Sequence, residues 1–385
     1  MNARIKKLWI AVMTLVGTII GVGIFAVPYA LDRVGVTVGA VYFLLLGGIQ
    51  LLQHLFYAET AIATAEKHRL VGLVERHLGK NSRHLASISS IFGFWGAMIA
   101  YILVGGVFLH TLLAGQLGGQ PWHYQLAWAV LGGLVIVRGL DFVSKVEFWM
   151  TIGLLATMGM IIGLGLPHVR PANFHFVAMG DFFLPYGIIL FALNGLSAIP
   201  SMEEIVGGDR NAFRLSVVYG SLIATAMTAL FGFVVWGVTG RATTEDAVAG
   251  LRLALGPDIT MIAALFGFLA VATSYFTTAL NLRETFEYDY KIRALPAWLM
   301  AAGVPLIVFL LGAESFIGII SFTGAVFGGI VAVLIAVMYI AVAKRGLVKD
   351  MPLGLSISLA RISILILSIG AGYEILTTAR KLFGP

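Results

Sequence analysis

Two apolar segments of this 385-residue chain are interrupted by the same short pattern of glycine and proline. The first interruption spans residues 23–28 (GIFAVP) and the second spans residues 195–200 (GLSAIP), so both fit G-[IL]-x-A-[VI]-P. Lipid cannot satisfy freed backbone groups, so a helix can break at membrane depth only where it packs on protein or lines a cavity. The pattern therefore predicts two discontinuous helices inside a bilayer, each broken where it packs on protein or lines a cavity.

The composition places the whole chain in the membrane. Hydrophobic residues make up 59% and charged residues 11%, where a soluble domain carries about 25% charged residues. Each apolar stretch is near or above the ~20 residues that cross a bilayer. The stretches are 8–31, 36–64, 86–115, 125–140, 146–166, 182–202, 213–240, 258–282, 294–312, 315–343 and 353–378. We expect an all-α integral membrane protein with about 11 transmembrane helices, forming a single polytopic domain over residues 1–385 and embedded in a lipid bilayer.

The basic residues predict how the chain is oriented. With the N-terminus inside, the inner segments hold 18 Lys and Arg residues and the outer segments hold 6. This bias predicts a multi-pass cell-membrane protein with a cytoplasmic N-terminus and an extracytoplasmic C-terminus. The net charge of +6 is scattered among short loops, which argues against a nucleic-acid partner.

The spacing of the interruptions predicts an internal repeat. Five spans precede the second interrupted span, so each half starts with a broken helix. A unit of five spans must place its copy upside down, which gives repeat one at about 8–166 and repeat two at about 182–343, with an eleventh helix at about 353–378. Broken spans at corresponding positions of two halves indicate the binding site of a secondary transporter.

Three segments carry a resemblance to a known family. Residues 17–31 (GTIIGVGIFAVPYAL), 100–109 (AYILVGGVFL) and 186–204 (YGIILFALNGLSAIPSMEE) resemble the amino acid/auxin permease family, close to its hydroxy and aromatic amino acid permeases. That family belongs to the amino acid–polyamine–cation superfamily, and the resemblance covers nearly the whole chain. It implies a LeuT-type 5+5 inverted repeat with discontinuous helices 1 and 6, and symport of amino acids by alternating access.

The broken first span is the main candidate for substrate binding. Unwinding there would expose backbone N–H groups to a carboxylate and carbonyls to an ammonium, as a zwitterion requires. The competing interpretation is that the glycines only allow close helix packing. The candidate residues of this break are Thr18, Ile19, Ile20, Gly21, Val22 and Gly23.

The second break and the third span supply the other substrate candidates. Asn194 and Gly195 lie at the break, and the Asn194 amide offers both donors and an acceptor. The resemblance implies that Phe191 covers the substrate from outside and that Tyr101 lines the pocket. The competing interpretation places Phe191 against lipid and Asn194 against a neighbouring helix.

Two ions are candidates for coupling. The pattern A-x-x-T-S at Ala270, Thr273 and Ser274 resembles half of the sodium site of LeuT-type symporters, whose partner carbonyls would be those of Gly17 and Ile20. Hydroxyls in membrane helices also bond to their own backbone, and proton-coupled relatives carry hydroxyls here, so sodium is favoured only slightly over the proton.

A proton route needs an ionisable group inside a span. Glu59 is the first candidate for it, with His54 and His110 as further ones. The fifth span has no interior lysine, which argues against a proton mechanism based on that residue. The pair Glu203 and Glu204 beyond the second break suggests an interhelical salt bridge or gate.

Other classes of function have less support. The chain has no repeated polar rings of a channel and no clustered intramembrane His, Asp or Glu of a membrane enzyme. It also lacks an HExxH, a Walker loop and a nucleophile elbow. We expect no enzyme activity, no cofactor beyond a coupling ion and no obligatory protein partner. A proton-coupled permease, or a sensor that binds amino acids without net transport, remains the alternative.

Overall fold

The structure is a computed structural model that describes residues 3–64, 66–178, 182–244, 247–256, 259–313, 319, 323–348 and 356–383. Every regular element in these ranges is a helix. The first half contains α1 (Ala3–Ile19), η1 (Val22–Ala26), α2 (Val27–Val34), α3 (Val36–Ile62), α4 (Leu70–Leu78), α5 (Lys80–Leu117), α6 (Pro121–Val137) and α7 (Leu140–Gly165). The second half contains α8 (Leu184–Ala192), η4 (Leu196–Ala198), α9 (Ile199–Val206), α10 (Arg210–Thr239), α11 (Val248–Leu255), α12 (Ile259–Glu284), α13 (Ala294–Trp298), α14 (Val304–Leu310), η8 (Thr323–Gly328), α16 (Gly329–Lys344) and α17 (Ile357–Phe383).

These helices account for each of the eleven predicted spans within the described part of the chain. Seven helices are apolar and long enough to cross a membrane, and α1 with α2 forms one more span that is bent by 49°. The other three spans are α6, α13 with α14, and α17. The predicted starts at residues 258, 315 and 353 lie outside the described residues.

The first span breaks where its glycines and proline lie. α1 ends at Ile19, Gly21 takes an extended backbone (φ −114°, ψ −157°), and a short 3₁₀ segment follows before α2 begins. Pro28 lies in the first turn of α2, where its missing N–H costs no helical hydrogen bond. The local sequence thus stops one helix and starts the next, as predicted.

The sixth span breaks in the same manner. α8 ends at Ala192, η4 spans Leu196–Ala198, and α9 starts with Pro200 in its first turn. A β-carbon built on Gly23 would lie 2.8 Å from the Cα atom of Ala192, so the two breaks lie against each other. The prediction of discontinuous first and sixth spans is confirmed.

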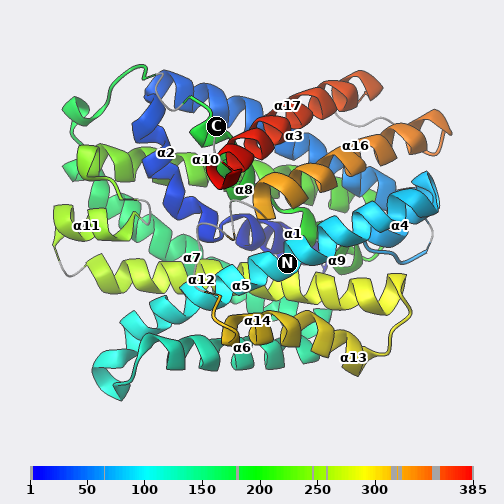
Figure 1. Cartoon of the computed structure of the whole chain (residues 1–385), viewed down its shortest axis with the longest axis horizontal. Coiled ribbons are helices and arrows are strands. Elements are labelled where there is room, and N and C mark those ends of the chain that lie inside the picture. Colours follow the sequence, from blue (N-terminus) through cyan, green and yellow to red (C-terminus); the bar gives the residue numbers. More distant parts are fainter. Residues whose placement is uncertain are drawn as a thin grey trace.

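The breaks lie in the interior of the molecule. α1 packs against α7, α9, α10 and α12, and Figure 1 shows it between α6 and α14 on one side and α3 and α17 on the other. Leu15, Val16 and Ile20 have no exposed surface. Leu44 of α3 and Trp149 of α7 are instead among the large side chains exposed at the surface. The inverted symmetry of the two halves and the orientation in the membrane stay predictions.

Candidate functional site

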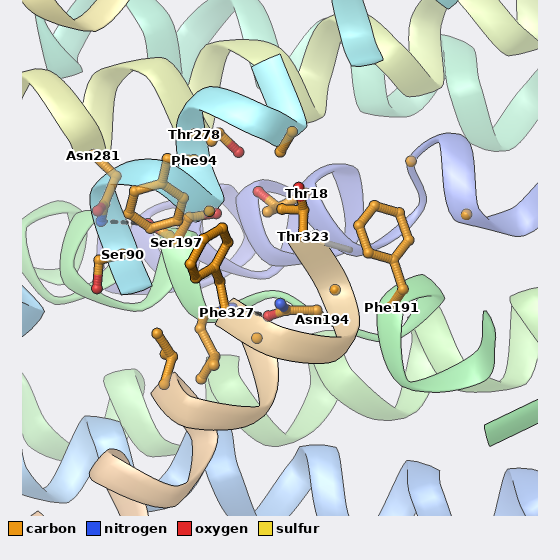
Figure 2. Close-up of a pocket in the computed structure, with 18 of the residues that line it drawn as sticks. Thr18, Ser90, Phe94, Phe191, Asn194, Ser197, Thr278, Asn281, Thr323 and Phe327 are labelled. Carbon is orange, nitrogen blue, oxygen red and sulfur yellow. Dashed lines mark hydrogen bonds between the residues drawn. The ribbon is translucent and has the colours of Figure 1, made fainter. Parts of the chain in front are cut away.

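A cavity lies beside the two breaks. It is lined by residues of the first, third, sixth, eighth and tenth spans, with Tyr57 of the second span and Leu70 of α4. Figure 2 shows Phe191 at one end of it and Asn281 with Ser90 at the other. Most of the predicted substrate residues line this cavity, namely Thr18, Ile19, Gly21, Val22, Gly23, Tyr101, Phe191 and Asn194. Ile20 and Gly195 lie next to the lining residues but do not contribute to it.

The first break presents unused backbone donors to the cavity. The Gly21 N–H donates to the Ile19 carbonyl (2.8 Å) and the Ile24 N–H donates to the Gly21 carbonyl (3.3 Å). Among the described residues, no hydrogen bond engages the N–H groups of Val22 and Gly23, which start η1. A helix start with free N–H groups favours an anion.

At the second break, the N–H groups that align with those of Val22 and Gly23 have partners, and the first of them, that of Asn194, donates to the Phe191 carbonyl (3.2 Å). The Gly195 N–H donates to His54 Nε2 (3.0 Å), and the Leu196 N–H donates to the Asn194 side-chain oxygen (3.1 Å). Because Nε2 accepts, the His54 proton is on Nδ1, which lies 2.9 Å from the Ser221 hydroxyl. His54, a sequence candidate for a proton route, therefore braces the sixth span as a neutral ring.

Phe191 fits between two glycines of other spans. A β-carbon on Gly23 would lie 2.8 Å from its ring, and one on Gly324 of η8 would lie 3.1 Å from its ring. The ring therefore has room only because both neighbouring positions are glycines. It bounds the cavity on that side (Figure 2).

The hydroxyls of the eighth span reach the carbonyl end of α1. Thr273 Oγ1 lies 2.7 Å from the Gly17 carbonyl and 3.2 Å from that of Ala270, and Ser274 Oγ lies 3.4 Å from the Gly17 carbonyl. Both hydroxyl residues are fully buried. The structure thus brings four of the predicted sodium ligands together, whereas within the described residues no hydrogen bond joins Ile20 to α12.

A buried carboxyl lies next to these hydroxyls and was missed by sequence reasoning. Glu147 of α7 is 2% exposed and accepts a hydrogen bond from Thr277 of α12. Thr277 is also bonded to Thr18 Oγ1 (2.9 Å), so Glu147 is linked through two hydroxyls to the cavity wall. The predicted fifth span began at residue 146, which placed Glu147 at a membrane edge. Because α7 begins at Leu140, it lies two turns inside the helix.

Glu59 has a different environment. Both of its carboxylate oxygens accept hydrogen bonds from Arg214 of α10, at 2.6 and 2.8 Å. A bidentate pair of this kind stabilises the ionised carboxylate. His110 packs edge-on against Tyr124 with 5.2 Å between ring centroids.

A charged cluster lies beyond the cavity, where α9 and α12 end. Arg69 is 2% exposed and donates to Glu204 (2.7 Å) and to Glu284 (3.0 Å). Beside it, the hydrogen bond with the Asp289 carboxylate raises the pKa of His68 above its ordinary value. The interhelical salt bridge expected of Glu204 is present, and its partner connects the sixth span to the eighth.

Further cavity residues also escaped the sequence reasoning. Ser90 and Phe94 come from α5, Asn281 comes from α12, and Phe327 comes from η8. The sequence signal for them was a serine and an asparagine inside long apolar helices, because polar side chains at membrane depth are costly and commonly serve a function. Only the folded chain tells which of the many membrane hydroxyls face the cavity.

Comparisons with known proteins identify the family. A model of the tryptophan/tyrosine permease family matches residues 4–370. The chain is 27% identical to the tyrosine-specific transport system 1 of Haemophilus influenzae, over 86% of this chain and 87% of that protein. It is 24% identical to a tryptophan-specific transport protein of Pseudomonas aeruginosa, over 72% of this chain and 70% of that protein.

A solved structure supports the fold. The crystal structure of MhsT in complex with L-phenylalanine matches with a TM-score of 0.66 at 16% identity, covering 95% of this chain and 97% of that one. This likeness and the two broken spans show the LeuT-type fold. The amino acid/auxin permease family expected from the sequence is close to the matching family without being the same one. The chain belongs to the tryptophan/tyrosine permease family, whose members are membrane transport proteins for amino acids and not enzymes.

Proposed function

We propose that this protein is an ion-coupled symporter of aromatic amino acids that works by alternating access. The observation that carries the proposal is the pair of unused N–H groups at Val22 and Gly23, which open into a cavity with aromatic walls. The tyrosine- and tryptophan-specific relatives support an aromatic substrate.

The backbone of the substrate would bind at the first break. Its carboxylate would accept from the N–H groups of Val22 and Gly23, where the dipole of η1 adds a favourable field. Its ammonium would donate to carbonyls at the ends of α1 and α8, where the helix dipole is negative. The side chain would then extend between Phe94 and Phe327, away from Phe191.

Two barriers would open in turn. Phe191 covers the cavity from one side, and the Arg69 cluster with Glu204 and Glu284 closes the other side. With the N-terminus in the cytoplasm, as the Lys and Arg distribution predicts, the Arg69 cluster is the inner barrier. Glu204 belongs to the sixth span and Glu284 to the eighth, and Arg69 binds both. Moving the broken spans against the third and eighth spans would pull the two carboxylates apart, so that Arg69 could no longer bind both.

Sodium is one candidate for the coupling ion. Thr273 and Ser274 place two hydroxyl oxygens next to the Gly17 carbonyl, between α1 and α12. If the two hydroxyl hydrogens rotated away from the Gly17 carbonyl, the lone pairs of the hydroxyl oxygens and of the carbonyl could all bind a cation. Sodium prefers such oxygen ligands. An ion bound there would hold α1 against α12 and so stabilise one conformation of the transporter, which we expect to be the outward-open one.

The proton is the second candidate, and the buried Glu147 favours it. A carboxyl at this depth is costly to leave charged and unpaired. Its described partner is a neutral hydroxyl, that of Thr277, which also bonds to Thr18 at the cavity. A change in the protonation of Glu147 would therefore alter the hydrogen bonds of Thr277 and Thr18 and so affect the substrate site. The proton would then take the coupling role that sodium has in the first candidate.

Uptake into proteoliposomes tests the function. Labelled tyrosine, tryptophan, phenylalanine and leucine are compared while sodium and pH gradients are imposed separately. Aromatic uptake that follows one gradient supports the proposal, whereas aromatic binding without uptake under either gradient replaces it with a sensor.

Two sets of variants then assign the ion. If sodium couples, Thr273→Ala with Ser274→Ala removes the sodium dependence, whereas Thr157→Ala, whose hydroxyl bonds only to its own helix, keeps it. If the proton couples, Glu147→Gln removes the response to the pH gradient and the exposed Asp141→Asn on the same helix does not.

A further inference from the structure

Two buried polar side chains lie at the end of the cavity away from Phe191, which we call the polar end. Ser90 of α5 and Asn281 of α12 lie at this end, each 3% exposed, and Phe94 and Phe327 lie between them and Phe191 (Figure 2). An amino acid whose backbone sits at the first break would direct its side chain along these rings. The polar end is therefore where the tip of a long aromatic side chain would arrive.

Ser90 carries a buried hydroxyl that is not bonded to any described residue. Hydroxyls elsewhere on α5 bond to the carbonyl one turn earlier, as Ser87 does with Arg83 (2.8 Å) and Thr111 with Val107 (3.0 Å). A buried polar group without a partner is uncommon and costs free energy. The Ser90 hydroxyl is therefore available to donate to, and to accept from, a bound molecule.

Asn281 offers an acceptor in a fixed orientation. Its Nδ2 donates to the Ser197 carbonyl at the second break (2.8 Å), and a carbonyl can only pair with the NH₂ side of the amide. Its Oδ1 takes part in no hydrogen bond among the described residues, and the side chain lines the cavity. The second break thus holds the Asn281 amide so that an acceptor remains for a ligand.

We propose that Ser90 and Asn281 form the polar end of the substrate side-chain site and select a ring that carries a hydroxyl, that of tyrosine, over an unsubstituted ring. Asn281 Oδ1 accepts from the phenol hydroxyl, and the Ser90 hydroxyl donates to the phenol oxygen. An indole N–H can only donate, so it satisfies one of the two groups. A phenyl ring satisfies neither, and it would seal both polar groups away from water.

This inference rests on the proposed function, because it needs an aromatic substrate with its backbone at the first break. It predicts that the wild-type protein takes up tyrosine at least about tenfold more efficiently than phenylalanine, the range expected when buried partners are left unpaired. The analogue 4-amino-L-phenylalanine, whose amino group can donate to Asn281 Oδ1 but is a poor acceptor for the Ser90 hydroxyl, retains only part of that advantage.

The test is competition for labelled tyrosine uptake by tyrosine, phenylalanine and 4-amino-L-phenylalanine. Ser90→Ala is expected to lower the tyrosine-to-phenylalanine selectivity about tenfold, mainly by weakening tyrosine. Thr111→Ala on the same helix, which removes an exposed hydroxyl bonded to its own backbone, keeps the wild-type selectivity.

The outcomes separate the inference from the function on which it rests. Absence of any aromatic uptake or binding contradicts the proposed function. Uptake of aromatic amino acids with equal efficiency for tyrosine and phenylalanine, or an unchanged selectivity in a folded Ser90→Ala protein, overturns the polar end alone.

Discussion

The two breaks share a sequence pattern and differ in what their backbone groups do. At the second break, the Gly195 and Leu196 N–H groups are bound by His54 and Asn194. At the first break, the N–H groups of Val22 and Gly23 are left without partners among the described residues. The same pattern of glycine and proline thus produces one braced break and one open break.

The two breaks also differ in the side chain at one aligned position. When the two GxxAxP patterns are superposed, Val22 falls opposite Asn194. The asparagine side chain caps the N–H two residues later, as such side chains do in turns. Valine has no acceptor and cannot do so. At the first break the Ile24 N–H, which is the group that such a cap would engage, bonds to the Gly21 carbonyl instead (3.3 Å), while the open groups are the N–H groups of Val22 and Gly23.

The largest effect is expected from closing the open break with a methyl group. In Gly23→Ala, the added β-carbon would lie 2.8 Å from the Cα atom of Ala192, so one backbone must move. We expect at least a hundredfold loss of tyrosine uptake, measured in proteoliposomes, because the two breaks separate and the free N–H groups shift. A valine at this position would add more bulk, so alanine gives the sharper test.

The matched control for this change is Gly187→Ala in α8. A β-carbon there would meet no atom within 4 Å, so uptake and thermal stability should stay near wild type. Normal tyrosine affinity in a folded Gly23→Ala protein would mean that the first break does not hold the substrate.

A smaller effect is expected from removing the brace of the second break. In His54→Leu, the buried Gly195 N–H loses its acceptor, which costs about 1–3 kcal/mol. We expect a lower melting temperature and a roughly tenfold loss of uptake, because the end of α8 that carries Phe191 is no longer fixed.

His54→Gln serves as the partial rescue for this brace, since its side-chain oxygen can accept from the same N–H. Equal loss in His54→Leu and His54→Gln would assign the histidine some role other than bracing the break.

Sequence reasoning found the breaks because their cause is local. Glycine and proline weaken a helix wherever they stand, so Gly21, Pro28 and Pro200 predicted the ends of helices without any knowledge of packing. The same reasoning could not select Ser90 or Asn281 from the many hydroxyl and amide side chains of the spans. Their roles depend on which helices meet at the cavity, and on whether a neighbour already uses the polar group.

Glu147 and Glu59 show the same limit for ionisable residues. Both are single acidic residues inside apolar segments, and sequence reasoning chose Glu59 for a proton route. In the fold, Glu59 is paired with Arg214, whereas Glu147 is bonded to the hydroxyl of Thr277. The partner comes from a helix more than a hundred residues away in each case, so the sequence holds no local sign of it.

The smallest effect is expected from exchanging the capping residue between the breaks. In Val22→Asn, the new side-chain oxygen can accept from the Ile24 N–H, as Asn194 does from Leu196. The Ile24 N–H now makes only a long bond of 3.3 Å to the Gly21 carbonyl, so it is free to change partner. The capped break should bind the substrate carboxylate about three- to tenfold more weakly, because a partial negative charge now lies beside it. Tyrosine affinity in detergent measures this directly.

The reciprocal Asn194→Val should reduce stability more than affinity, since it uncaps a break that holds no carboxylate. If Asn194→Val weakens binding more than Val22→Asn does, the carboxylate binds at the second break and the assignment of the two breaks is reversed.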